Sequence, residues 1–175
     1  MEKIVIKETK HADTRALKDG EELTEEAVKH DTELHIEAVE KAGEYICDKI
    51  KEQFKEHDHT KISELSEFTD ALSSGAKGAE FKKHPWWKKH LTERHHLNDK
   101  VPDDVNLIDV LEMICDCCVA GMARTGEVYD LDLPDEVLKK AFKNTAEMIK
   151  KDIKVEKDDA DEKDKAMKLF GLDKK

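Results

Sequence analysis

The sequence predicts an all-α protein built around one compact helical domain, and its composition and periodicity support this. Charged residues make up 42% of the 175 residues and aromatic residues 5%, with seven glycines and three prolines. A β-sandwich of this size would need more turn residues and more β-branched runs. Apolar residues instead recur at helical spacing along most of the chain. We therefore expect a bundle of about five to seven helices, large enough to bury a core without disulfides.

Three segments are expected along the chain. Residues 1–22 show no sustained period and should form an irregular N-terminal arm, in which residues 3–7 (KIVIK) are either a short strand or a packed extended segment. Residues 23–155 carry the helical pattern. Residues 156–175 are a block of charge ending in a few apolar residues, which is typical of a solvated terminus.

The first helix should begin after Thr24, a suitable N-cap residue followed by acids in the first turn. Its apolar stripe runs from Val28 to Ile50. Pro85 is suited to the first turn of a later helix. Further helices are expected over residues 60–72, 85–97, 104–124 and 134–155.

Charge and cysteine usage exclude several classes of protein. The net charge of -11 makes duplex nucleic acid a poor default partner. Three of the four cysteines, Cys115, Cys117 and Cys118, lie within four residues, which fits small buried side chains in a reducing cytosol better than a disulfide framework. No apolar run approaches the ~20 residues of a membrane span, and no signal peptide is evident. We expect a cytoplasmic protein that has no membrane partner.

Candidate metal ligands begin in the first helix. His35 lies on its apolar stripe, and His57 continues that stripe seven residues after Ile50. Asp58 follows at the helix end, where an inward carboxylate must be protonated, paired or metal-bound. For His35 alone, a hydrogen-bonded core histidine and a metal ligand both remain open.

Two later segments carry further candidates. Asp109, Glu112 and Asp116 share one narrow stripe of an otherwise apolar helix. This stripe is either the solvent-exposed face of an amphipathic helix or an acidic row facing an internal cation. The expected third helix holds a cluster of imidazoles, which either bind a transition metal or simply gather on the surface. They are His84, His90, His95 and His96.

Taken in order, these residues resemble the HD-domain superfamily of metal-dependent phosphohydrolases, whose ligands run His, His-Asp and Asp along an all-helical core. The match is His35, His57-Asp58 and Asp116, with Asp109 as the alternative final ligand. The chain is more closely similar to a group of phage and bacterial HD-like proteins with no settled activity. The motifs that carry this likeness span residues 57–61, 87–96 and 109–116, and the resemblance covers about residues 22–155.

The resemblance implies one or two divalent transition-metal ions (Mn, Fe, Co, Ni or Zn). The first ion would take His35, His57, Asp58 and Asp116. His90, with His95 or His96, would bind a second ion or contact phosphate. Glu64 or Glu112 would orient a histidine ligand.

Substrate roles also follow from the resemblance. Lys61 and Arg94 would hold phosphoryl oxygens, and Trp87 or Trp86 would stack on a base or pack in the core or an oligomer contact. Many nucleotidases of the superfamily carry an acid where Lys61 stands, and Glu64 comes later here, so the usual scheme of water activation is in doubt. Lys61, Glu64 and Arg94 are the candidate catalytic residues.

The implied function is metal-dependent hydrolysis of a nucleotide or another small phosphate ester, in the host cytoplasm if the chain is phage-encoded. One alternative is a non-catalytic helical module, such as a phage accessory factor, that binds a protein and keeps a structural metal. Another is a degenerate HD fold without metal. A homo-oligomer is compatible with each of these.

Overall fold

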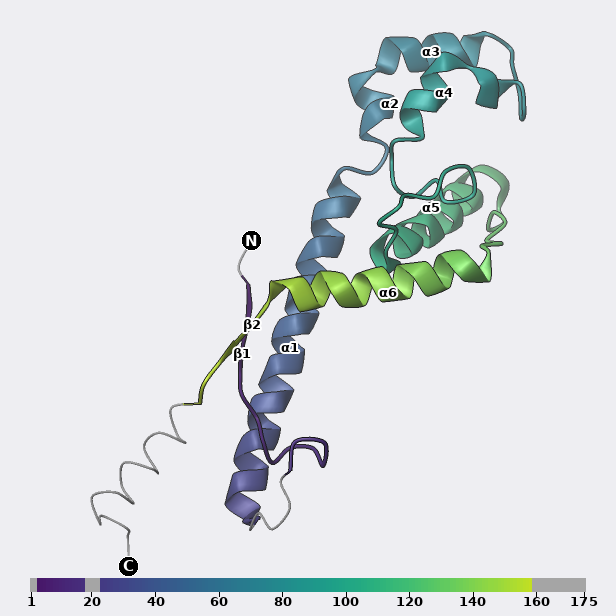
Figure 1. The fold of residues 1–175 in the computed structure, drawn as a ribbon. Coiled ribbons are helices and arrows are strands. Elements are labelled where there is room, and N and C mark those ends of the chain that lie inside the picture. Colours follow the sequence, from purple (N-terminus) through teal and green to yellow (C-terminus); the bar gives the residue numbers. More distant parts are fainter. Residues whose placement is uncertain (1–2, 18–22, 159–175) are drawn as a thin grey trace, which may run out of the picture. The chain divides into compact units, whose positions relative to one another are not determined.

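The computed structural model describes residues 3–17 and 23–158, which are mostly helical (Figure 1). They form two compact units. Among the described residues, unit 1 comprises residues 3–17, 23–47 and 149–158, and unit 2 comprises residues 48–148. The predicted helical character is confirmed, but a small parallel sheet in unit 1 departs from the all-α expectation. Most of the expected C-terminal tail, residues 159–175, lies outside the described residues.

The sheet of unit 1 joins the two ends of the described chain. Strand β1 (Ile4–Lys7) pairs in parallel with β2 (Ile153–Glu156), with Ile4 opposite Ile153 (Figure 1). Strand β1 begins with three β-branched residues in a row, and β2 alternates β-branched with charged residues; both compositions suit a pleated, half-buried surface. The strand alternative for residues 3–7 is therefore confirmed. The last helix ends at Asp152, short of the predicted Val155, because the chain continues as β2.

Helix α1 (Glu25–Lys55) starts where the sequence predicts. The Thr24 hydroxyl accepts a hydrogen bond from the Ala27 backbone N–H at 3.1 Å, which confirms Thr24 as the N-cap. The buried Asp31 carboxylate accepts the backbone N–H groups of Lys10 and His11 at 2.7 and 2.6 Å. These bonds fix the segment after β1 against the helix.

In unit 2 the helices α2 (His59–Ser63), α3 (Leu65–Ser73) and α4 (Pro85–His90) lie together (Figure 1). The single helix predicted over residues 60–72 is interrupted at Glu64, whose backbone leaves the helical region. Trp86 is 1% exposed and stacks on Phe68 with ring centroids 4.3 Å apart. A short 3-10 helix, η1 (Phe81–Lys83), precedes α4.

Helix α4 begins at Pro85 as predicted but ends at His90, so the expected helix over residues 85–97 is wrong beyond its first turns. The reason lies in the side chains that follow. Glu93 and His95 are both buried. Residues two apart point to different sides of a helix. An irregular loop allows both to be buried in the same site.

Helix α5 (Leu107–Thr125) is capped at both ends, by a box between Asn106 and Asp109 and by Gly126 in the left-handed region. It packs with the first part of α6 (Asp135–Asp152). Their shared core consists of Leu97, Val105, Val110, Met113 and Ala141. None of the described helices combines the length and the apolar content that crossing a lipid bilayer requires.

Candidate metal centre

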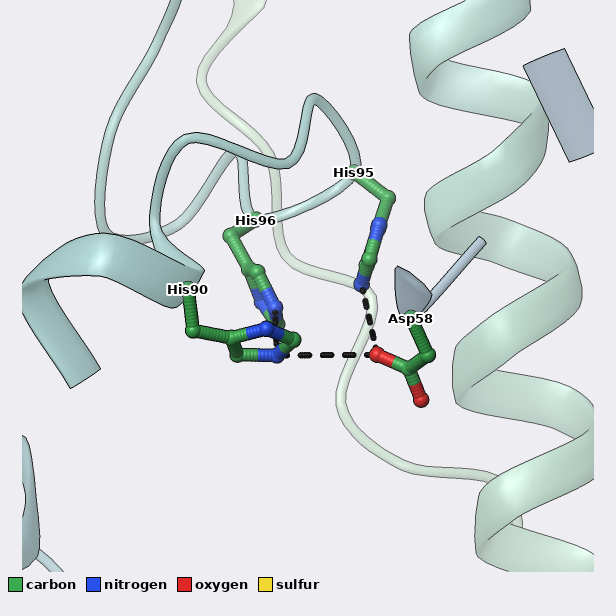
Figure 2. A group of neighbouring side chains, drawn as sticks. All are labelled: Asp58, His90, His95 and His96. Atoms are coloured by element: carbon green, nitrogen blue, oxygen red, sulfur yellow. Dashed lines mark hydrogen bonds and ion pairs between the residues drawn. The ribbon is translucent and has the colours of Figure 1, made fainter. Parts of the chain in front are cut away.

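Four side chains of unit 2 turn their ligand atoms toward one point (Figure 2). Asp58 stands between α1 and α2, His90 ends α4, and His95 and His96 lie in the loop after α4. One donor atom from each lies within 4.8 Å of all the others. Asp58 Oδ1 is 3.5 Å from His90 Nε2 and 3.8 Å from His95 Nε2. We call these four residues the Asp58 group.

Buried polar atoms in the Asp58 group lack partners among the described residues. Asp58 Oδ1 and both ring nitrogens of His95 are buried without a hydrogen bond. Such atoms are rare because each one costs free energy on folding. Three imidazoles and a carboxylate are donors that Zn²⁺ and neighbouring transition metals accept. The Asp58 group could therefore hold a metal ion.

The ring nitrogens of His90 and His96 also face each other. Their Nε2 atoms are 2.7 Å apart. Two imidazole lone pairs cannot face each other at this distance, so a proton or a cation must lie between them. Burial, reinforced by His95 and His90, lowers the pKa of His96 to about 3. His96 is therefore neutral and able to act as a ligand.

A second set, the His57 group, shares one residue with the first and consists of His57, His95 and Asp116. The Nε2 atom of His57 lies 3.5 Å from Asp116 Oδ1. Hydrogen bonds that His57 donates to the carboxylates of Asp116 and Glu112 raise the pKa of His57 to about 10. A proton on His57 thus supplies positive charge among these carboxylates.

Two residues of the acidic stripe of α5, Glu112 and Asp116, lie at this site. Glu112 is buried, accepts hydrogen bonds from His57 Nδ1 at 2.9 Å and Gln53 Nε2 at 2.7 Å, and lies 3.3 Å from His95 Nδ1. Burial alone would raise the pKa of Glu112, but the bonds from His57 and Gln53 and the nearby ring of His95 lower it to about 2. Because Glu112 accepts the Nδ1 proton of His57, Nε2 is the atom that could bind an ion after losing its own proton.

Asp109 has a different role from Asp116. Its fully buried carboxylate accepts Arg94 Nε at 2.6 Å and Arg94 Nη2 at 2.8 Å, as well as the Asn106 backbone N–H. Asp109 belongs to neither group. Arg94, predicted to hold phosphate, is instead committed to this ion pair and to Asp104.

His35 is not brought to the cluster. Its side chain is exposed on α1, and it belongs to neither of the groups found among the described residues. The predicted apolar stripe around it is itself open, with Val39 58% exposed. The helical spacing that placed His35 on an inward face is therefore not matched by burial at this position.

The remaining predicted residues lie around the Asp58 group. Lys61 Nζ forms an ion pair with Asp58 Oδ2. Glu64 lies at the break between α2 and α3, with Oε1 3.8 Å from Lys89 Nζ, and is outside both groups. The ring of Trp87 is 5.4 Å from that of His90 and 5.2 Å from that of His96. Trp87 therefore forms part of the wall of the site.

Three residues at the site were not predicted: Gln53, Thr60 and Glu93. Glu93 accepts the backbone N–H groups of Asp58 and Thr60 at 2.6 and 2.9 Å. The first of these bonds holds Asp58 at φ 57, a left-handed conformation that aspartate tolerates better than most residues. For Glu93, the only signal in the sequence was its position close to the two adjacent histidines, His95 and His96.

A cavity of about 370 Å³ opens beside the His57 group. Its polar lining includes His57, Asp58, Asp116 and Arg124, and its apolar lining includes Phe54. Arg124 forms no ion pair with any other residue in the described part of the chain. The cavity therefore combines the candidate ligands with an unpaired cation.

Comparison with known proteins returned no matching family model, curated protein or solved structure.

Proposed function

We propose that this chain is a divalent-metal-dependent phosphohydrolase acting on a nucleotide or another small phosphate ester, with unit 2 as an HD-like domain. The observation that carries the proposal is the Asp58 group, whose buried donor atoms lack partners and lie next to the His57 group and its cavity. The convergence of His57, Asp58 and Asp116 supports the HD-like assignment.

The donor set fits a divalent transition metal. Nitrogen-rich sites with one or two carboxylates suit Zn, Fe, Co, Ni and Mn. A bound ion would lower the pKa of a coordinated water and offset the charge of a phosphate. Glu112 would keep His57 Nδ1 protonated, and Asp58 would exchange its pairing with Lys61 for the ion.

The cations near the cavity suit a phosphoryl group. Lys61 lies next to Asp58, and Arg124 lines the cavity. Once Asp58 binds an ion, Lys61 can donate to a phosphoryl oxygen, as can the guanidinium of Arg124. Arg94 is replaced in this role because Asp109 holds it. A cavity of about 370 Å³ is within the usual range for small-molecule sites.

One observation favours the non-catalytic alternative. The Asp58 group supplies four protein donors, and four protein donors are typical of closed structural zinc sites. The His57 group supplies three, which leaves a coordination position for water or substrate. An ion confined to the Asp58 group would therefore indicate a structural metal in a binding module.

Two substitutions of one residue type test the proposal. His95→Gln removes the residue common to both groups, while His35→Gln removes an exposed histidine outside them. Protein purified without chelator is analysed for metals and assayed for phosphate release from a panel of nucleotides and phosphomonoesters. We expect His95→Gln to lose both metal and activity, and His35→Gln to keep both.

Each contrary outcome has a distinct meaning. Wild-type protein that neither contains nor binds a transition metal would eliminate the metal site. Metal-loaded protein that hydrolyses nothing in the panel would favour the binding module. Loss of metal in His35→Gln with retention in His95→Gln would restore the ligand set implied by the sequence resemblance.

A further inference from the structure

The hydroxyl of Thr60 lies between two buried polar side chains. Its oxygen is 2.7 Å from His90 Nδ1 and 2.5 Å from Glu93 Oε1. All three side chains are buried. A threonine hydroxyl has one proton to donate, so it can serve only one of these neighbours as a donor.

Glu93 is the neighbour that accepts this hydrogen bond. Its carboxylate already accepts the backbone N–H groups of Asp58 and Thr60, and an ionised carboxylate can only accept hydrogen bonds. The bond from Asp58 ends on Glu93 Oε2 and the bond from Thr60 on Oε1, so both oxygens of the carboxylate act as acceptors. The Thr60 hydroxyl therefore donates to Glu93.

The consequence falls on His90. With its proton committed, the Thr60 oxygen must accept a hydrogen bond from His90 Nδ1–H, and Glu93 Oε1 is a second acceptor 3.4 Å from the same nitrogen. Neutral His90 then carries its lone pair on Nε2. That atom is the one facing Asp58 Oδ1 and His96 (Figure 2).

We infer that Glu93 and Thr60 are positioning residues that fix the tautomer of His90 and the backbone of Asp58, so that both present a ligand atom to one divalent transition-metal ion. The inference rests on the metal site of the proposed function, but not on its reaction. Glu93 reaches Asp58 directly and His90 through Thr60, and so links two ligands that are 32 residues apart in sequence.

Histidine tautomers can be measured in the metal-free wild-type protein. In protein labelled with ¹⁵N-histidine, two-bond ¹H–¹⁵N spectra at a pH where His90 is neutral distinguish a protonated from an unprotonated ring nitrogen. His90→Gln identifies the signal. We expect the proton on Nδ1. A proton on Nε2 of His90 in the wild type would overturn the inference, whatever the variants do.

Metal affinity gives the second measurement. Zn²⁺ dissociation constants are obtained by competition with a chromophoric chelator. Thr60→Val removes the hydroxyl at nearly constant volume and should weaken Zn²⁺ binding about 10- to 100-fold, as for other residues that orient a ligand. Thr60→Ser restores the hydroxyl and should bind within about threefold of the wild type.

Thr69→Val is the matched control, because the Thr69 hydroxyl bonds only to the Leu65 carbonyl of its own helix. It should leave the Zn²⁺ affinity unchanged. Equal losses in Thr60→Val and Thr60→Ser, or none in Thr60→Val, would overturn the inference. If circular dichroism shows that Thr60→Val does not fold, the inference is tested by the tautomer of His90 in the wild type and by the Zn²⁺ affinity of Thr60→Ser. Neither measurement depends on phosphate release, so failure of the proposed reaction would be seen separately.

Discussion

Replacing Asp109 with asparagine is expected to destabilise the protein while leaving metal binding intact. Asp109 is fully buried and receives two bonds from Arg94, one from Gln53 and one from the Asn106 backbone N–H. Asparagine keeps the shape but places an amide N–H₂ opposite one of these donors. The interaction with Asp109 raises the pKa of Arg94, as expected for a strong ion pair.

The magnitude follows from the burial of the two partners. Breaking a buried ion pair by removing one charge costs about 3–5 kcal/mol. The Arg94 side chain is 31% exposed, so water would solvate part of the freed guanidinium. We therefore expect a loss of about 2–4 kcal/mol in the free energy of unfolding. Urea denaturation with chelator present measures this loss, and chelator competition measures the metal affinity.

Asp104→Asn is a control on the same arginine. Asp104 Oδ1 lies 3.0 Å from Arg94 Nη1, but its side chain is 79% exposed, so its removal should cost less than about 0.5 kcal/mol. Equal stability of Asp109→Asn and Asp104→Asn would refute the reasoning about burial. Loss of metal in a stable Asp109→Asn protein would make Asp109 a ligand, the alternative that the sequence left open.

Three other outcomes are expected. Gly121→Ala should destabilise by about 1–3 kcal/mol in thermal unfolding, because its Cβ would lie 2.4 Å from a backbone oxygen of the following loop. Gly43→Ala, in open space within α1, should instead stabilise by up to about 1 kcal/mol, and equal effects would contradict the close approach. A hydrogen bond that His30 donates to Asp158 raises the pKa of His30 above its unfolded value, so this pair should stabilise fully below about pH 6 and lose its effect as the pH rises through the folded pKa. His30→Ala should then cost up to about 1 kcal/mol at about pH 5.5 and less at about pH 9, and a loss independent of pH would exclude the pair. Asp116→Asn should weaken Zn²⁺ binding while changing unfolding by less than about 1 kcal/mol, and unchanged affinity would remove Asp116 from the ligands.

Local signals in the sequence predicted the helices better than their ends. Thr24 and Pro85 mark helix starts through backbone chemistry that depends only on neighbouring residues. The stop at His90 depends on burying Glu93 and His95 in one site, and no local rule contains that information. A strand near residues 3–7 was one of two predicted alternatives, but its partner β2 was not predicted, because the two strands pair across almost the whole chain.

The candidate site was predicted in part for the same reason. His57, Asp58 and Asp116 are in or next to the converging groups, and the histidines after α4 complete them. Glu93 could not be recognised, because its role consists of hydrogen bonds to residues more than 30 positions away. His35 shows the converse limit, since periodicity places a residue on a face of a helix but does not say what covers that face.

The loop between α4 and α5 contains both residues of the candidate metal site and residues of the hydrophobic core. His95 and His96 are followed directly by Leu97, and Val105 closes the other end of the loop, with both apolar side chains buried beside Met113. If the Asp58 group binds an ion as proposed, its affinity and the packing of Leu97 are thermodynamically linked. A core substitution that lets the loop open would lower the population of the binding-competent state and weaken affinity by the same factor. Conversely, a bound ion would offset part of the stability lost through a poorly packed core. The metal-bound protein could then stay folded with core substitutions that would unfold the metal-free protein.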